Sequence, residues 1–406
     1  MKDMEACVVG GGPIGLFAAA CLQERGVEVG VIDAEWERPV RSYACGLHPE
    51  TLRQFDRLGL MPALQELAHR VDRVVVCDEQ KRGTAIELAA VGGPFPHVLT
   101  LRQSDLQDLL AQRLAQLGVE LALGQQVRTI SMSSGAVHCV SVPQQRGAGS
   151  AANGAAALPP GDAIVRRAEY VIAADGFDSV GRRALGVEFM DAKRSEAFAI
   201  FEFEADLSEL QHEAYVVLGA DSVSAFWPLG PSLGRWTFQI WEQLDETPSL
   251  EALQQLLAER APWFRPRPEQ LGWVTTSSFE RRIARRFGSD RLWLAGDAAH
   301  VTTPIGFQSM NRGFVEVSVL AELISNRLRG EAEARGFQRF EREQQREWRR
   351  LLGLGTTPLP GWLTSADQAR LAPCLPASGV DLDTLLGELS PSLWPQAPAA
   401  SSQRTI

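Results

Sequence analysis

The residues best suited to chemistry lie between Gly296 and Gly313, in the stretch GDAAHVTTPIGFQSMNRG. Four apolar residues, 292–295, precede this stretch and predict a short strand. Gly296 and Asp297 would therefore lie at the carboxyl end of a strand, where open α/β sheets bind ligands. The Asp297 carboxylate could there accept hydrogen bonds from sugar-like hydroxyl groups. The alternative is an ordinary strand, turn and helix with an acidic cap.

A helix is expected to follow this turn. Apolar residues recur at every third or fourth position from Met310 to Ile324, which is the helical period. The free N–H groups at the amino end of this helix would face the same crevice as Asp297 and would stabilise an anion there. The segment therefore predicts a binding site for a ligand that combines hydroxyl groups with negative charge.

A glycine-rich turn near the amino terminus forms a second ligand-binding pattern. An apolar strand, residues 6–9, runs into the sequence GGGPIG and then into a helical stretch. This order fits the dinucleotide pattern GxGxxG, whose glycines permit a tight turn, admit a pyrophosphate and let the helix pack on the strand. A second strand then ends at an acid that can accept from both ribose hydroxyls. The residues that carry this expectation are Gly10, Gly12, Pro13, Ile14, Gly15 and Asp33.

A third pattern follows the predicted strand 170–174, where Asp175, Gly176, Ser179 and Arg182 occur in succession. An acid and a glycine just past a strand end can meet a phosphate or a sugar edge. Ser179 or its neighbour Asp178 could equally cap the short helix that follows. Both roles can hold together.

Composition limits the class of protein. The chain has 406 residues, of which 45% are hydrophobic, so it can bury a large core and suffices for two or three domains. Its net charge of −10 argues against nucleic acid as a partner. The uncharged stretch 6–23 contains glycines and a proline and lacks a basic flank, which argues against a signal peptide or a membrane span. The six cysteines lack metal-ligand spacing, so we expect reduced core residues and no metal site. Reduced cysteines in turn favour a cytoplasmic protein, and we expect no stable membrane insertion.

Together these motifs resemble the flavin-dependent aromatic hydroxylases of the para-hydroxybenzoate hydroxylase type, which include the ubiquinone-biosynthesis hydroxylases. The resemblance covers nearly the whole chain. It implies that the amino-terminal glycines and Asp33 bind the ADP half of non-covalently bound FAD, that Asp297 holds the ribityl chain, and that Pro304 lies beside the reacting edge of the flavin. The family motif DGxxSxxR, which serves both FAD and the pyridine nucleotide, matches Asp175, Gly176, Ser179 and Arg182. Further FAD contacts that the resemblance implies are Arg41, Arg102, Gly296, Gly306, Phe307, Gln308, Ser309, Met310 and Asn311.

The chain departs from the family's usual PPxGGQGxN where the helix begins. Thr303 replaces the first proline, Phe307 the second glycine and Ser309 the third. A close approach of bare backbone to the flavin is thus less strongly expected than in the family. Phe307 could instead cover the ring or shape the pocket.

The resemblance implies an α/β architecture: a Rossmann-like FAD-binding domain with an inserted, mostly antiparallel β-sheet substrate domain and a helical C-terminal region. The sequence supports this independently, because strand-like segments follow one another between residues 195 and 241 without intervening helices. The expected boundaries are 1–70, 97–185 and 285–350 for the FAD-binding domain, 71–96 and 186–284 for the substrate domain, and 351–406 for the C-terminal helical and loop region.

The reaction implied is hydroxylation of an aromatic, phenolic or polyketide-like small molecule by a monomer or homodimer. NADH or NADPH would reduce FAD, O2 would add to the reduced flavin, and the resulting hydroperoxide would transfer one oxygen atom to an electron-rich carbon in a site that excludes water. No second GxGxxG is present, so the nicotinamide is expected to visit the flavin transiently. Residues on only one face of the substrate sheet can look toward the flavin. The candidate substrate contacts are Trp227, Phe203, Tyr215 and Gln239.

His48, in the loop RSYACGLHPETL, is the nearby group that titrates around neutral pH. It could act as the catalytic base that deprotonates a phenol, or it could orient the turn at Pro49. The absence of an obvious base leaves room for epoxidation. The alternatives are therefore an epoxidase, an isoprenoid reductase or halogenase of the same fold, although the halogenase motif WxWxIP is absent, or a non-catalytic FAD-fold binding protein.

Overall fold

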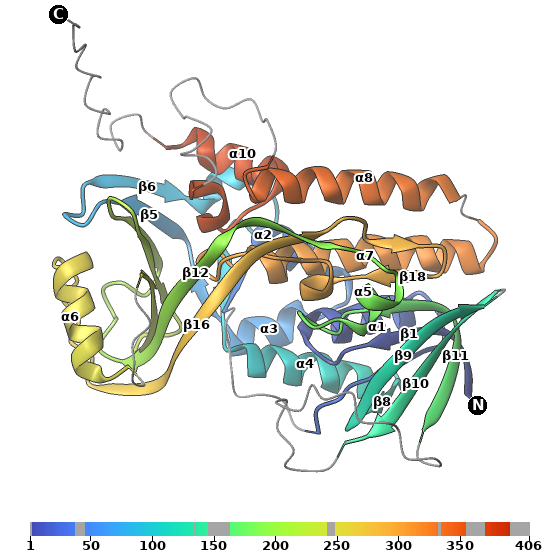
Figure 1. The fold of residues 1–406 in the computed structure, drawn as a ribbon. Helices are drawn as coiled ribbons and strands as arrows, with labels where there is room; N and C mark the ends of the chain where they lie inside the picture. The colour runs from blue at the N-terminus through green and yellow to red at the C-terminus, as the bar shows by residue number, and fades with distance from the viewer. Residues whose placement is uncertain are drawn as a thin grey trace, which may run out of the picture.

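The structure is a computed structural model that describes residues 2–36, 45–133, 135–144, 163–241, 248–331, 334–354 and 370–389. Two sheets of eight strands each and a third of three strands form its framework. In Figure 1 the first large sheet lies at the amino-terminal end of the molecule, and the second extends away from it toward helix α6 (Leu250–Arg260).

The first sheet is parallel at its centre. Its main path runs β17 (Gly288–Ser289), β18 (Leu292–Leu294), β11 (Ile164–Ala173), β1 (Lys2–Val9), β2 (Val29–Ile32) and β8 (Glu120–Ala122). The antiparallel ribbon of β9 (Gln125–Ser133) and β10 (Ala136–Pro143) joins it at β11. Strand β1 pairs in parallel with both neighbours, and its residues Ala6 to Val9 are buried, as expected for a parallel strand covered on both faces.

Helices pack around this sheet, and α1 (Pro13–Glu24), α4 (Gln103–Gln116) and α7 (Gln308–Leu328) begin near the edge where its parallel strands end. Helix α1 contacts both α4 and α7, and α7 contacts α8 (Ala334–Leu351). The short helix α5 (Val180–Ala184) follows β11, and the turn η2 (Gly296–Ala298) follows β18. The loops at the carboxyl ends of β1, β11 and β18 therefore meet the first turns of α1 and α7.

The second sheet is antiparallel except where β13 pairs with β5. Its order is β19 (His300–Val301), β16 (Gln270–Ala284), β12 (Phe189–Glu204), β15 (Leu233–Ile240), β14 (Val223–Pro228), β13 (Glu213–Leu218), β5 (Arg73–Cys77) and β6 (Gly83–Glu87). The predicted combination of a Rossmann-like sheet with a mostly antiparallel second sheet is confirmed. The boundaries expected for the domains stay a prediction.

The remaining elements connect these two sheets. The third sheet is β3 (Gly46–Leu47), β7 (Val98–Thr100) and β4 (His69–Val71), with helices α2 (Pro49–Arg57) and α3 (Met61–Leu67) beside it in the chain. A turn η1 (Leu88–Val91) follows β6, and the C-terminal segment contains η3 (Ala372–Cys374) and α10 (Gly379–Gly387). Figure 1 shows α10 next to the carboxyl end of α8. None of the helices in the described ranges is both long and apolar enough to cross a membrane.

Candidate active site

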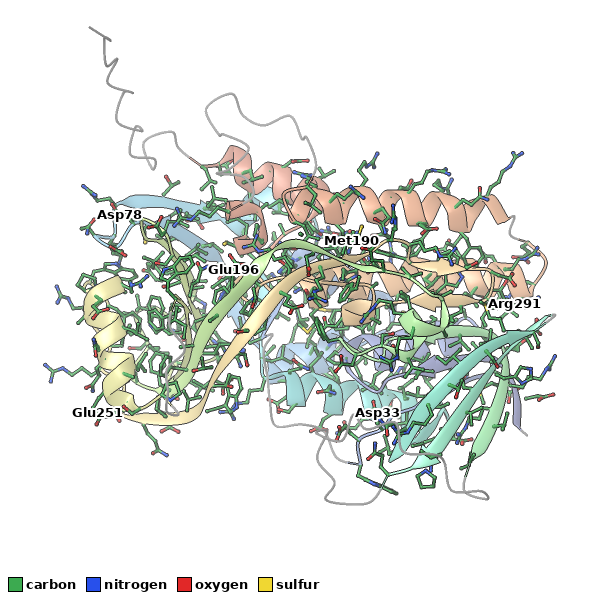
Figure 2. The ribbon with its side chains drawn as sticks, in the orientation of Figure 1. Asp33, Asp78, Met190, Glu196, Glu251 and Arg291 are labelled. Carbon is green, nitrogen blue, oxygen red and sulfur yellow. The ribbon has the colours of Figure 1, made fainter. Side chains whose placement is uncertain are left out.

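An elongated cleft runs along the carboxyl ends of the first sheet's strands and reaches β16 of the second sheet. It consists of two cavities of about 540 and 670 Å³. Both are lined by Gly12, Gln103, Ala174 and Gly176, so they adjoin at the amino end of α1. Figure 2 marks one end of the cleft at Asp33, and Met190 and Glu196 mark the course of β12 in the second sheet.

The larger cavity is built by the glycine-rich turn. Gly10 has a φ of +110°, and a Cβ on it would lie 2.1 Å from the Ala174 carbonyl oxygen. A Cβ on Gly15 would lie 1.9 Å from the Gly10 carbonyl oxygen, whereas one on Gly12 would meet nothing within 4 Å. The first and third glycines therefore serve packing, and Gly12 presents bare backbone to the cavity.

Asp33 directly follows β2 at the rim of the same cavity. Its carboxylate accepts hydrogen bonds from the backbone N–H groups of Gly11 and Glu35. Burial raises the pKa of the carboxyl, and the two backbone hydrogen bonds oppose that shift. The carboxylate thus lies beside the turn at Gly11 and Gly12, where an adenosine ribose would place its hydroxyl groups next to a pyrophosphate.

Two helix amino ends line the smaller cavity. Pro13 and Ile14 are the first residues of α1, while Ser309 and Met310 belong to the first turn of α7, and all four border the cavity. Ser309 also fixes the loop before it, because its hydroxyl accepts the backbone N–H of Thr302 at 3.0 Å. The partial positive charge at both helix ends favours an anionic ligand between them.

Asp297 faces the smaller cavity from the turn η2. Its side chain is accessible from the cavity but lies deep in the protein, and this desolvation raises the pKa of the carboxyl, with His300 opposing the shift. Gly296 has a φ of +58° and lies against the Ile14 side chain. No protein hydrogen bond to the Asp297 side chain appears in the described part of the chain, so a ligand's hydroxyl groups could replace its lost hydration.

The motif after β11 serves as both a cap and a cavity wall. The Asp175 carboxylate accepts the Ser179 hydroxyl at 2.6 Å and two backbone N–H groups at the start of α5. Arg182 donates to the carbonyl oxygens of Phe177 and Ala298. Arg182 therefore connects this motif to the turn at Asp297, while Asp175 and Gly176 line the cleft.

The loop before α7 divides its residues between the cavity and the protein interior. Pro304 and Phe307 line the cavity. Gly306 lies under the C-terminal segment, because a Cβ there would lie 2.4 Å from the Pro373 carbonyl oxygen. The Gln308 amide donates to the carbonyl oxygens of Leu375 and Ala377 at 2.6 Å and of Ala372 at 3.4 Å. The expectation that the Gln308 side chain contacts FAD directly is thus not supported.

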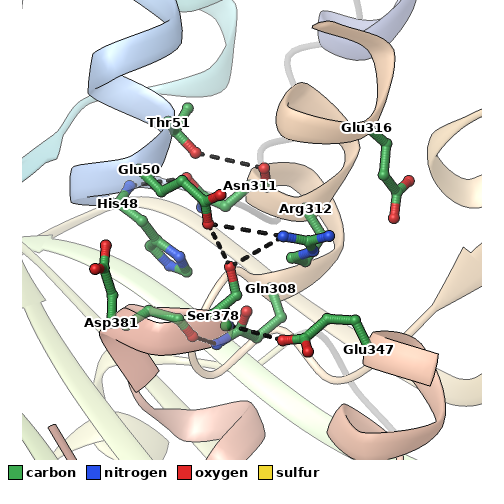
Figure 3. Close-up of polar contacts among 12 residues, drawn as sticks. His48, Glu50, Thr51, Gln308, Asn311, Arg312, Glu316, Glu347, Ser378 and Asp381 are labelled. Atoms are coloured by element: carbon green, nitrogen blue, oxygen red, sulfur yellow. Dashed lines mark hydrogen bonds and ion pairs between the residues drawn. The ribbon is translucent and has the colours of Figure 1, made fainter. Parts of the chain in front are cut away.

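Asn311 also points into the protein. Its side-chain oxygen accepts the backbone N–H of His48 at 2.8 Å, and its amide donates to the carbonyl oxygens of Gly46 and Phe307. Figure 3 shows the contact with His48 together with the polar network that joins α2, α7 and the C-terminal segment. Asn311 therefore fastens strand β3 to the start of α7, and the expectation that it binds FAD directly is not supported.

The structure does not support His48 as the catalytic base. It is 1% exposed, does not line the cavity, and its Nε2 lies 2.8 Å from the Gly306 carbonyl oxygen. Burial lowers its pKa to about 3, with Arg312 acting in the same direction. The ring is therefore neutral at physiological pH, and the structure favours the alternative in which His48 orients the backbone around Pro49.

The four candidate substrate contacts lie on opposite faces of the second sheet. Phe203 and Tyr215 belong to the cluster that packs against Leu253 and Leu257 of α6, so the structure corrects the expectation for both. Trp227 faces the other side, where its ring centroid lies 4.9 Å from that of Phe307. Gln239 shares that face, but it accepts the Val223 backbone N–H and donates to Glu196.

Arg102 caps α4 and pairs with Glu202 at 3.2 Å. The next residue, Gln103, borders both cavities in its place. Arg41 lies outside the described residues. No sequence pattern predicted the part of the cavity wall that β16 contributes, which consists of Ser277, Ser278, Phe279 and Glu280.

The residues of the cleft fit FAD. Gly12 leaves open space at the amino end of α1 for a pyrophosphate, and two carboxylates, Asp33 and Asp297, stand on either side of it at sites suited to the ribose and the ribityl chain. The apolar wall at Pro304 and Phe307 suits a flat ring system. The fold and the cleft thus define an α/β protein of the dinucleotide-binding flavoprotein class.

Comparison with known families agrees with this class. The model of the FAD binding domain family matches residues 3–352. The chain therefore belongs to the FAD binding domain family.

Curated relatives include two Streptomyces monooxygenases. The chain is 28% identical over 330 residues to rifampicin monooxygenase of Streptomyces venezuelae, a match that covers 76% of this chain and 61% of the relative. It is 27% identical over 348 residues to 6-methylpretetramide 4-monooxygenase of Streptomyces rimosus, covering 81% of this chain and 57% of the relative. The chain thus spans about three fifths of the length of these relatives.

Solved structures share the fold. The p-nitrophenol 4-monooxygenase of Pseudomonas putida superposes with a TM-score of 0.74 at 22% identity, over 95% of this chain and 96% of that chain. Aklavinone-11 hydroxylase, solved in a ternary complex with FAD and aklavinone, superposes with a TM-score of 0.65 at 20% identity, over 87% of this chain and 66% of that chain. Similarity at this level of identity shows the fold.

Proposed function

We propose that this protein is an FAD-dependent monooxygenase that uses NADH or NADPH and O2 to hydroxylate an aromatic, phenolic or polyketide-like small molecule. The observation that carries the proposal is the smaller cavity, where the first turns of α1 and α7, Asp297 and Pro304 meet the antiparallel sheet. Family membership and relatives named as monooxygenases of rifampicin and 6-methylpretetramide support the reaction class.

The bound FAD would supply the redox chemistry, in which a nicotinamide reduces the flavin and O2 is then activated. The chain's own residues bind and orient it: Gly12 and Asp33 at the ADP end, and Asp297 and the amino end of α7 at the flavin end. Phe279 and Phe307 give the cavity an apolar wall that excludes water from the reacting edge.

In this proposal neither His48 nor Glu280 serves as a general base. His48 is buried and its low pKa keeps the ring neutral, and Glu280 forms an ion pair with Arg282 at the cavity wall. A substrate that is already electron-rich needs no such base. Phenols and enols that ionise readily are therefore the preferred substrate class. The protein itself is proposed to act in the cytoplasm as a monomer or homodimer.

Purification and turnover would test the proposal. The expected result is a yellow protein that retains FAD, oxidises NADH or NADPH faster when a phenol is present, and forms a product heavier by one oxygen atom that derives from ¹⁸O2. A colourless protein that cannot be reconstituted with FAD would support the non-catalytic binding protein instead. A flavoprotein that reduces a substrate without consuming O2 would support a reductase.

A further inference from the structure

Phe307 occupies an unusual position for an aromatic residue. It caps the amino end of α7 with φ +57° and ψ +24°, a left-handed conformation that side chains adopt rarely and at a cost. Its ring borders the smaller cavity, yet the residue is only 3% exposed. The ring is therefore part of the cavity's inner wall.

Two neighbours shape the space that the Phe307 ring fills. A Cβ on Gly46 would lie 2.6 and 2.7 Å from Cδ2 and Cε2 of the ring, so the absent side chain of Gly46 leaves room for it. On the other side the Trp227 ring lies 4.9 Å away and its indole N–H donates to the Ile305 carbonyl oxygen at 3.2 Å. The ring is wedged between β3 and β14.

The backbone at Phe307 is held as firmly as the ring. The Asn311 amide donates to the Phe307 carbonyl oxygen at 2.9 Å and to that of Gly46 at 2.8 Å. The next residue, Gln308, is tied to the C-terminal segment by its amide. Bonds on both sides thus hold a strained residue in place, as expected where the strain serves a site.

Beyond Phe307 and Trp227 lies a buried charged row rather than open space. Trp227 lies opposite Arg235 on the neighbouring strand, and Arg235 lies opposite Glu202 on the next strand. The side chains of Arg235 and Glu202 also form an ion pair. Phe307 borders the cavity, whereas Trp227, Arg235 and Glu202 do not line it. The cavity of about 540 Å³ must hold the flavin ring system as well as the reacting part of a substrate, whereas ligand sites for a single drug-sized molecule already measure about 300 to 1,000 Å³.

We propose that Phe307 is a specificity-determining residue that closes the inner end of the cavity, so that one aromatic ring of a substrate enters between the flavin site and β16. Broader fused-ring systems are excluded from the depth of the cavity by the ring of Phe307. This inference rests on the proposed function for its substrate class, and on the geometry of Gly46, Trp227 and Phe307 for the position of the wall.

The test compares wild type, Phe307→Gly and Phe307→Leu, with Phe314→Leu as the control, since Phe314 is a buried aromatic of α7 that packs on Phe17 and Phe55 in the core. Glycine suits the left-handed backbone, so Phe307→Gly removes the ring without adding strain. Phenol, 2-naphthol and 2-anthrol are titrated into each FAD-loaded protein, and binding is read from the shift of the flavin absorption spectrum. The expected result is that Phe307→Gly tightens binding of 2-anthrol relative to phenol at least tenfold, Phe307→Leu by less, and the control not at all.

Unchanged binding ratios in both Phe307 variants that retain FAD would overturn the proposal. A second readout is independent of FAD and of the substrate class: crystals of Phe307→Gly under xenon should show a xenon atom between Gly46 and Trp227 that is absent from wild type. Collapse of the surrounding residues into that space would also overturn the proposal. If the wild-type protein binds FAD but none of the phenols shifts the flavin absorption spectrum, phenols are not its substrates and that part of the proposed function is wrong. The xenon experiment alone then decides whether Phe307 closes the cavity.

Discussion

The Asp297 carboxylate faces the flavin end of the cleft from a desolvated position. Its pKa is raised because the fold opposes ionisation, so at neutral pH the charged group reduces the stability of the ligand-free protein. The same charge would strengthen hydrogen bonds from ligand hydroxyl groups. Binding and stability therefore make opposite demands on this residue.

Replacement of Asp297 by asparagine should separate these two effects. Loss of a charge-assisted hydrogen bond of about 1.5 to 3 kcal/mol corresponds to FAD binding that is weaker by about 10- to 100-fold. The melting temperature of the apoprotein should stay equal or rise, because the desolvated charge is gone. Fluorescence titration with FAD and thermal unfolding of the apoprotein measure the two quantities.

Asp290→Asn provides the matched control, since Asp290 is exposed on the same segment and has a φ of +53°, which asparagine tolerates. It should leave both FAD affinity and stability unchanged. Undiminished FAD affinity in Asp297→Asn would remove this residue from the site.

His48 should affect stability rather than the pH dependence of turnover. Its pKa is lowered from 6.5 to about 3 by burial, so between these values the unfolded chain binds the proton that the folded protein does not. Stability from this source is fully present above pH 6.5 and is lost as the pH falls, by up to about 1.4 kcal/mol per pH unit. From pH 7 to pH 5 the wild type should therefore lose about 2 kcal/mol more than His48→Gln, whose side chain does not titrate.

Urea unfolding of both proteins at the two pH values measures this difference, and the pH–rate profile should keep its shape near neutrality in His48→Gln. A kinetic pKa near neutrality that disappears in the variant would restore His48 as a base. Equal losses of stability would show that the ring is not buried as a neutral group.

Among the secondary-structure elements, those with strong local patterns were predictable from the sequence. The turn at Gly10 was predictable because Gly10 and Gly15 leave no room for a side chain and because a strand precedes the turn and a helix follows it. The apolar runs between residues 195 and 241 predicted strands β13 to β15 to within about two residues of their ends, whereas β12 begins six residues before the expected start of its run. The face that each strand shows to the cavity was not predictable, because alternation gives two sets of side chains without saying which one α6 covers. Phe203 and Tyr215 fell in the covered set for this reason.

Long-range contacts explain the other differences. Gln308 matches a cofactor motif, but its amide partners lie more than 60 residues further along the chain, in a segment whose sequence has a weak helical pattern. That segment, 370–389, packs on Gly306 and is tied to α2 by the ion pair of Asp381 with Arg53. No local pattern announces such contacts.

The Gln308 side chain should therefore hold the C-terminal segment in place. Gln308→Leu leaves carbonyl groups of the segment without their buried donor, at a cost of at least about 2 kcal/mol. Hydrogen exchange of the backbone amides between residues 371 and 382 should accelerate, and FAD should dissociate faster because the loop at Pro304 and Phe307 loses its support. Gln345→Leu is the control, since the Gln345 amide donates to the Ala284 carbonyl oxygen instead. Equal protection of the segment in both variants would contradict this role of Gln308.

The cleft draws its walls from segments distributed over the entire chain. Gly12, Asp33, Gln103 and Gly176 come from four separate segments of the first half, and Phe307 follows more than a hundred residues later. The second sheet contributes β16 to the same cavity. A ligand that spans both cavities therefore contacts both large sheets at once and binds the folded protein but not the unfolded chain.

FAD should for this reason raise the unfolding temperature of the protein as a single unit. At a free concentration 100 times its dissociation constant, a ligand adds about 2.7 kcal/mol to the free energy of unfolding, which for a chain of this size corresponds to a rise of about 3 °C. AMP and riboflavin, which each fill one cavity, should give smaller shifts at the same concentration. Differential scanning calorimetry across a series of FAD concentrations measures the effect. A melting temperature that does not change with FAD, or a shift equally large with AMP alone, would show that the ligand does not bridge the two cavities.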